Sequence, residues 1–120
     1  MIQFKPLTEE HEWQWIWERA HPMAVKDTQG IVAYDDATGK IAAIVVMDSW
    51  TPSGCQTHFA IDNPMAIKRG LFREVAIHIH VVCDRRYIFG LIPANNDAAH
   101  KFDLKMGFEE VARIPEGYDN

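Results

Sequence analysis

The order of strand-like and helix-like segments is the feature that most limits the fold of this chain. Short apolar or alternating runs predict strands, and apolar residues three or four positions apart predict helices. The segments follow one another as β-α-β-β-β-α-β-α-β. This order predicts an α/β (α+β) fold, in which helices pack against the faces of a mixed sheet. The strands are expected at 2–7, 30–37, 40–50, 55–61, 87–93 and 108–114, and the helices at 9–20, 65–86 and 96–106.

The first helix carries an apolar stripe. Thr8 is expected to cap its N-terminus, because a hydroxyl there can accept a hydrogen bond from a backbone N–H group of the first turn. Trp15 lies off the stripe and is expected either to be exposed or to belong to a site. The stripe itself, at i, i+3, i+4 and i+7, consists of Trp13, Ile16, Trp17 and Ala20.

The segment 65–86 fits two structures. Its middle, Val75–Val81, alternates like a strand, whereas its length favours a helix, which we therefore expect. His78 and His80 would share a face only in a strand. On a helix they point to different sides and cannot bind one metal ion together, so both are expected to be structural and no metal site is predicted.

Composition argues against several classes of protein. A chain of 120 residues, 48% of them hydrophobic, suits one domain spanning 1–120. The net charge of -5 disfavours nucleic-acid binding, which needs a basic surface. No apolar run reaches the roughly 18–20 residues of a membrane span, and the first residues lack the pattern of a signal peptide. Cys55 and Cys83 are too few for a disulfide framework and are expected to be buried thiols, which favours a cytoplasmic location.

The run Asn96–Glu109 resembles the signature of the GNAT superfamily of N-acetyltransferases. An Asn, small residues and the aromatic Phe102 precede the pair Gly107–Phe108, which leads into a strand. The order of segments is also that of the GNAT fold, so the resemblance covers essentially the whole chain. It implies a mostly antiparallel sheet whose splayed central strands, here Cys55–Ile61 and Tyr87–Pro93, hold the pantetheine arm of acetyl-CoA like an added strand. It further implies acyl transfer from acetyl-CoA, or another acyl-CoA, to a primary amine.

The resemblance also implies which residues contact the acyl-CoA. In the family, the loop after the first splayed strand holds the pyrophosphate through backbone N–H groups and the dipole of the next helix. The equivalent stretch, Pro64–Gly70, has one glycine where the family usually has more, and its two cations could compensate by charge. The implied cofactor-binding residues are Phe59, Ile61, Ile67, Lys68, Arg69, Gly70, Asn95 and Asn96.

His58 and Asp103 are the implied catalytic residues. A base must remove a proton from the substrate ammonium before the amine attacks the thioester. Imidazole, with an ordinary pKa of about 6.5, suits this task and favours His58 on the first splayed strand over the alternatives Asp48 and Asp62. A histidine in an alternating strand is also commonly a surface residue. Asp103 stands where the family often has a Tyr that protonates the leaving thiolate, and it could do so only with a raised pKa.

Three further segments look like those of small GNAT-like proteins encoded by bacteriophages. Such proteins often have eroded cofactor loops and can be virion components. The chain also ends at Asn120, before the family's usual last strand, so that strand could be supplied by another chain, the sequence could be truncated, or the fold could do without it. An unfilled sheet edge would invite pairing with a strand of another chain. An alternative therefore stays open: a GNAT-fold binding or structural protein without catalysis, with a homo-oligomer or virion partner and a location within a phage particle. The segments are Asp48–Pro52, His58–Pro64 and Ala112–Tyr118.

Overall fold

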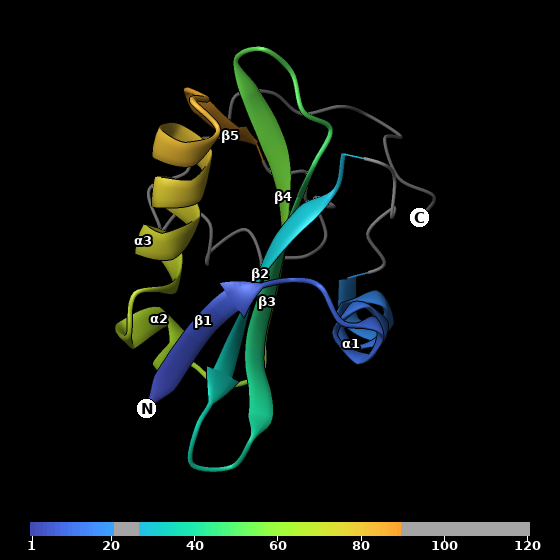
Figure 1. The fold of residues 1–120 in the computed structure, drawn as a ribbon, viewed down its shortest axis with the longest axis vertical. Helices are drawn as coiled ribbons and strands as arrows, with labels where there is room; N and C mark the ends of the chain where they lie inside the picture. The colour runs from blue at the N-terminus through green and yellow to red at the C-terminus, as the bar shows by residue number, and fades with distance from the viewer. Residues whose placement is uncertain (21–26, 90–120) are drawn as a thin grey trace, which may run out of the picture. The chain divides into compact units, whose positions relative to one another are not determined.

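A computed structural model describes residues 1–20 and 27–89 of the chain. The chain divides into two units, and the described residues belong to the first, Met1–Gly90. The elements predicted at 96–106 and 108–114, and the end of the strand predicted at 87–93, lie outside the described residues. The described elements are β1 (Ile2–Pro6), α1 (Glu10–Ala20), β2 (Gln29–Asp35), β3 (Lys40–Asp48), β4 (Gly54–Ile61), α2 (Met65–Lys68), α3 (Leu71–Ala76), the π-helical segment η1 (Ile77–Val82) and β5 (Tyr87–Phe89) (Figure 1).

The five strands form one sheet in the order β1-β2-β3-β4-β5. The first three pairings are antiparallel, and β5 pairs with β4 in parallel. The predicted turn between β2 and β3 is confirmed: Gly39 has a φ of 72° and donates its N–H to Asp35 O over 2.8 Å. Glycine suits this turn because a positive φ costs it little. The predicted mixed, mostly antiparallel sheet with flanking helices is thus confirmed.

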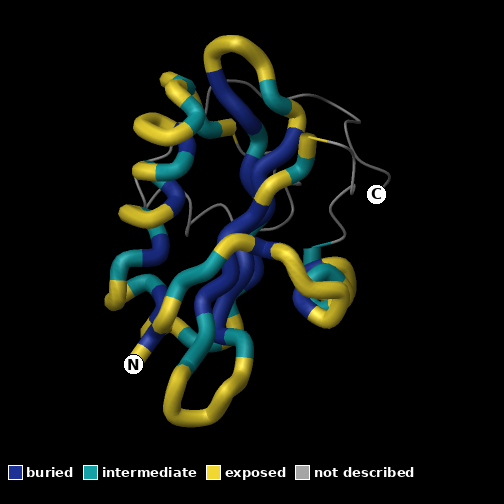
Figure 2. Tube along the Cα trace, viewed as in Figure 1, coloured by how far each residue is buried: buried dark blue, intermediate teal, exposed yellow. Residues whose placement is uncertain are grey.

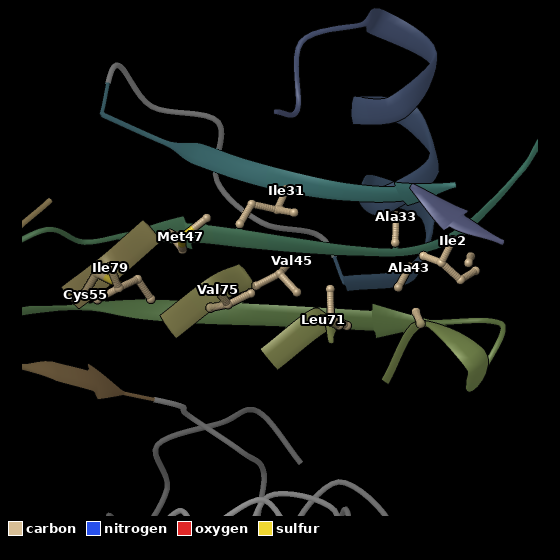
Figure 3. Close-up of a cluster of buried hydrophobic side chains, with 12 residues drawn as sticks. Ile2, Ile31, Ala33, Ala43, Val45, Met47, Cys55, Leu71, Val75 and Ile79 are labelled. Carbon is tan, nitrogen blue, oxygen red and sulfur yellow. The ribbon is translucent and has the colours of Figure 1, made fainter. Parts of the chain in front are cut away.

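Helices cover both faces of the sheet, α1 on one side and α2, α3 and η1 on the other (Figure 1). The central strand β3 is therefore buried over nearly its whole length (Figure 2). On the α3 side, side chains from β2, β3 and β4 meet those of α3 and η1 (Figure 3). The buried residues of that core include Ile31, Val45, Met47, Cys55, Leu71, Val75 and Ile79, and those of the α1 core are Leu7, Ile16, Val32, Ile44, Val46 and Ala60.

The segment predicted as one helix at 65–86 is helical but divided. Gly70 has a φ of 105°, a left-handed conformation that separates α2 from α3. After Ala76 the bonding becomes π-helical, and the N–H of Cys83 reaches His78 O over 2.9 Å. Within this wider turn Val82 is 68% exposed, although its helical spacing from Ile79 and Val75 would place it on the buried face of a regular α-helix. In the described part of the chain, no helix combines the length and apolar character needed to cross a bilayer.

The first helix differs from the prediction in its buried face. Trp17, placed on the apolar stripe, is 55% exposed, and the fully buried positions of α1 are Glu12 and Ile16. Trp15 is half-buried and packs against the α1 core. The helix begins at Glu10. The Thr8 hydroxyl, predicted to cap it, accepts a hydrogen bond from Lys5 Nζ over 3.1 Å, and the Glu12 carboxylate accepts the N–H groups of residues 8 and 9.

The buried Glu12 carboxylate explains this orientation of α1. Lys5 Nζ lies 2.7 Å from both of its oxygens, and Tyr34 donates its hydroxyl to it over 2.5 Å. Burial alone would raise the pKa of Glu12, but the hydrogen bonds from Lys5, Tyr34 and the two backbone N–H groups outweigh it and lower the pKa to about 2. Burial and the bond to Glu12 raise the pKa of Tyr34 to about 12. One carboxylate thus ties α1 to β1 and β2.

Replacement of Glu12 by Gln is expected to lower the free energy of unfolding by about 2 kcal/mol, because the charge-assisted hydrogen bonds that the buried carboxylate accepts are weakened or lost. In the wild type the same stabilisation is present above the unfolded pKa of 4.5 and is lost as the pH falls towards about 2. Urea unfolding at pH 7 and at pH 3 measures both effects. The exposed Glu10→Gln is the control, and equal stability of the two variants would contradict the assignment.

A close backbone contact fixes the start of the β4–β5 pair. Gly54 pairs with Tyr87, and a Cβ on Gly54 would lie 2.5 Å from the Tyr87 carbonyl oxygen. The N–H groups of Arg86 and Tyr87 both reach Ser53 O, over 2.7 and 2.9 Å. Only a residue without a side chain allows β5 to approach this closely.

Gly54→Ala is therefore expected to destabilise the protein by about 2 kcal/mol through overpacking. Exchange of the Tyr87 amide proton should also become faster, which amide hydrogen exchange measures. Ser53→Ala, an exposed neighbour in the same turn, should change neither quantity. Unchanged stability of Gly54→Ala would show that β5 can shift without cost.

Candidate active site

The second half of β4 is open towards β5 among the described residues. The last described pair joins Gln56 to Phe89, and Thr57 Oγ1 donates to Phe89 O over 3.4 Å. No strand in the described ranges pairs with β4 beyond that point on this side. β4 and β5 thus lie in one sheet, as the resemblance implied. The divergence expected between them would begin after Phe89 and falls outside the described residues.

The structure brings two of the candidate bases together. His58 on β4 lies opposite Val46 on β3, and Asp48 is two residues further along β3 on the same face. His58 Nε2 lies 2.9 Å from Asp48 Oδ2. The His58 side chain is 25% exposed and that of Asp48 is 7% exposed. The other carboxylate oxygen, Asp48 Oδ1, is buried and has no hydrogen-bond partner among the described residues. The arrangement is an imidazole at the surface held by a carboxylate beneath it.

The third candidate base, Asp62, is engaged elsewhere. Arg19 donates through Nε to Asp62 Oδ1 over 3.2 Å and through Nη2 to Oδ2 over 3.0 Å. The guanidinium also stacks on Trp15, 3.7 Å from the ring centroid. This pair attaches the end of α1 to the end of β4. The sequence gives no signal for it, because 43 positions separate the two residues.

The implied cofactor residues of β4 have their side chains in the core. Phe59 and Ile61 pack against the α3-side core, and the ring of Phe59 lies 5.4 Å from that of Phe72. Any contact of these two positions with an extended ligand would therefore use their backbone groups.

The stretch that resembles the phosphate loop forms α2 and its C-cap. The N–H groups of Ile67, Lys68, Arg69 and Gly70 are bonded to carbonyl oxygens of the same turn, over 3.0 to 3.5 Å. The side chains of Lys68 and Arg69 are exposed. A Cβ on Gly70 would meet nothing within 4 Å, so this glycine is required by its φ and not by a close approach.

The other candidates fall into two groups. Asp103, Asn95 and Asn96 lie outside the described residues. The separation of the two histidines of η1 is confirmed: His78 Nε2 contacts Gln29 Oε1 and His80 Nδ1 contacts Arg85 O, both over 2.7 Å. Within the ranges described, no three His, Cys, Asp or Glu side chains are grouped as metal ligands would be.

Three solved structures share this fold. No protein-family model and no curated protein matches the chain. The aminoglycoside antibiotic 6'-N-acetyltransferase AAC(6')-Ih from Acinetobacter baumannii is 16% identical, with a TM-score of 0.73 over 100% of this chain and 99% of that one. Mutant forms of the spermidine/spermine N-acetyltransferase SpeG from Vibrio cholerae are 12% identical, with a TM-score of 0.78 over 100% and 87%. AAC(6')-Iy, in complex with the bisubstrate analogue CoA-S-monomethyl-acetylneamine, is 12% identical, with a TM-score of 0.67 over 100% and 99%.

These likenesses show that the chain has the GNAT fold that its sequence resembles. Neither the fold nor these three structures supports the bacteriophage origin that the second resemblance suggested.

The two thiols differ in their surroundings. Cys55 is completely buried in the α3-side core, whereas Cys83 is half-buried, so the prediction of two buried thiols is wrong for Cys83. Burial, reinforced by the nearby Cys83 and Asp48, raises the pKa of the Cys55 thiol to about 11. At pH 8 only about one molecule in a thousand would carry the Cys55 thiolate, the form that reacts. Cys55 is therefore unsuited to carry an acyl group.

Iodoacetamide at pH 8 is accordingly expected to modify Cys83 first and Cys55 only after unfolding. Mass spectrometry of digests with and without urea measures the two rates. A Cys83→Ser variant should take up no label in its folded state. Rapid labelling of Cys55 in that variant would contradict its burial.

Proposed function

We propose that this chain is an acyl-CoA-dependent N-acyltransferase that transfers the acetyl group of acetyl-CoA to a primary amine. The pair His58–Asp48 carries the proposal, because His58 lies on β4 just beyond the last described pair with β5 and is held there by Asp48 of β3. In the GNAT fold this is the region where the thioester would lie between the two strands. An imidazole there can take the proton that the acceptor must lose.

The open side of β4 and the cations after it fit an acyl-CoA. Backbone groups of β4 beyond Gln56 would pair with the pantetheine arm. Lys68 and Arg69, both exposed, would bind the phosphates by charge. Because their own N–H groups are already bonded, the backbone contribution would have to come from the first turn of α3. Asn95 and Asn96 would contact the pantetheine amides, as the resemblance implies.

In the proposed reaction His58 accepts a proton from the acceptor's ammonium group. The free amine then forms a bond from its nitrogen to the thioester carbonyl carbon, and the carbon–sulfur bond breaks. The leaving sulfur takes a proton from water or from Asp103, and the product nitrogen loses its remaining extra proton. The overall change is one amide and one free thiol formed, with one proton released.

The acceptor is proposed to be a small cationic amine. Two of the similar structures are named for aminoglycoside or spermidine and spermine acetylation, both substrates with several amino groups. The net charge of -5 would draw such cations towards the protein.

One observation favours a second candidate, a GNAT-fold binding or structural protein without turnover. The N–H groups expected to cradle the pyrophosphate are already hydrogen-bonded within α2. This candidate predicts a stable homo-oligomer or partner complex and no release of CoA from acetyl-CoA, which sedimentation and a thiol-release assay together would show.

Acetyl-CoA at 100 times its Kd is expected to stabilise the protein by about 2.7 kcal/mol, seen as a higher Tm. Arg69→Glu should weaken binding at least tenfold, because a phosphate contact becomes a repulsion. Lys40→Glu, an equal charge reversal on an exposed residue at the start of β3, is the control and should bind as the wild type does.

Calorimetric titration of the three proteins gives the Kd values. Absence of any Tm shift at millimolar acetyl-CoA would remove the acyltransferase proposal. Equal weakening by both charge reversals would instead indicate a nonspecific effect of charge.

A further inference from the structure

We propose that Asp48 is a positioning residue that keeps the proton of neutral His58 on Nε2, which makes Nδ1 the atom that accepts the substrate proton. The catalytic meaning of this inference rests on the proposed function. The protonation pattern of His58 does not, and it can be tested by itself.

The first step is the identity of the atoms in contact. Asp48 Oδ2 lies 2.9 Å from His58 Nε2. An ionised carboxylate only accepts hydrogen bonds, so the contact requires a proton on Nε2. A neutral imidazole carries one proton in all, which leaves the lone pair on Nδ1. The choice between the two ring nitrogens is therefore set by Asp48.

The second step is the difference in exposure between the two side chains. The imidazole is 25% exposed, while the carboxylate beneath it is 7% exposed. A cationic acceptor arriving from solvent can reach the ring but not the carboxylate. Of the two neighbours, His58 is thus the group that exchanges a proton with substrate, and Asp48 acts only through it.

The third step is the incomplete bonding of Asp48. Its second oxygen, Oδ1, is buried and bonds no group in residues 1–20 and 27–89, so His58 is the one described side chain that bonds this carboxylate. A buried carboxylate is costly unless it is paired. When Nδ1 accepts a proton, the ring keeps Nε2–H on Asp48 and becomes cationic beside that carboxylate. This matches the general role of a carboxylate behind a catalytic histidine.

The alternative role is purely structural, with Asp48 and His58 joining β3 to β4. A structural pair would also contribute to stability, so loss of stability alone does not separate the two roles. The positions of the protons on the ring, and a fall in kcat without a change in KM, do separate them.

The test uses the full chain with 15N-labelled histidine. In the wild type, long-range 1H–15N spectra should show Nε2 of His58 protonated, with an imidazole N–H that exchanges slowly. Asp48→Asn keeps the size of the side chain and removes its charge, and its amide can face Nε2 with either the oxygen or the NH2 group. The preference for Nε2–H should therefore weaken, and the remaining N–H should exchange faster. Asp62→Asn makes the same charge change in the surface pair with Arg19 and should leave the His58 signals unaltered.

Where acetyl-CoA turnover is measured with spermidine, Asp48→Asn should lower kcat at least 100-fold and leave the KM for acetyl-CoA unchanged. A wild-type spectrum with Nδ1 protonated overturns the proposal, also in the case that Asp48→Asn does not fold. In folded Asp48→Asn, an Nε2–H signal with unaltered population and unaltered exchange rate overturns it as well. The predicted spectra without any turnover of the wild type would support the role of Asp48 in holding His58 and would count against the proposed function.

Discussion

The alternation of side chains between the two faces of β3 and β4 determines where the candidate bases His58 and Asp48 lie. Val46, Asp48 and His58 face α1, and their sequence neighbours Met47 and Phe59 face α3. A slip of one residue would exchange these sets and place a carboxylate and an imidazole in the apolar α3-side core. Because β3 is covered on both faces, the free energy of burial enforces one register. The chemistry of the site is thus a consequence of how the core packs.

The α1 face contains two buried carboxylates with very different surroundings. Glu12 accepts hydrogen bonds from Lys5, Tyr34 and two backbone N–H groups, and the bonds to Lys5 and Tyr34 join α1 to β1 and β2. Asp48 is bonded through one oxygen to His58, and its other oxygen has no partner in the part of the chain that the structure describes. A fully bonded carboxylate suits a structural role, because its acceptor positions are already used by the protein. Asp48 has fewer hydrogen bonds, so its interaction with the protein depends more strongly on the charge of its neighbour His58.

Much of the fold could be predicted from local patterns. The β2–β3 turn at Gly39, the order of elements along the chain from β1 to β5 and the helical nature of 65–86 follow from periodicity and turn chemistry. The buried face of α1 could not be predicted, because a glutamate took a position that hydrophobicity assigns to Trp17. The division at Gly70 and the π-turn of η1 were missed for a related reason: a helical pattern shows the apolar stripe and not the hydrogen bonds. Both members of the His58–Asp48 pair were candidate bases, but their contact depends on the register of two strands.

The bare backbone at Gly54 has a mechanical consequence. The Tyr87 carbonyl oxygen lies against Gly54, and the N–H groups of Arg86 and Tyr87 share the oxygen of Ser53. At this end of the pair, β4 and β5 can therefore neither approach more closely nor slide easily past each other. A ligand that enters between β4 and β5 would therefore have to separate them at the end away from Gly54. The resulting strain would fall on the short connection between η1 and β5, so the stiffness of that connection would govern how easily the two strands separate.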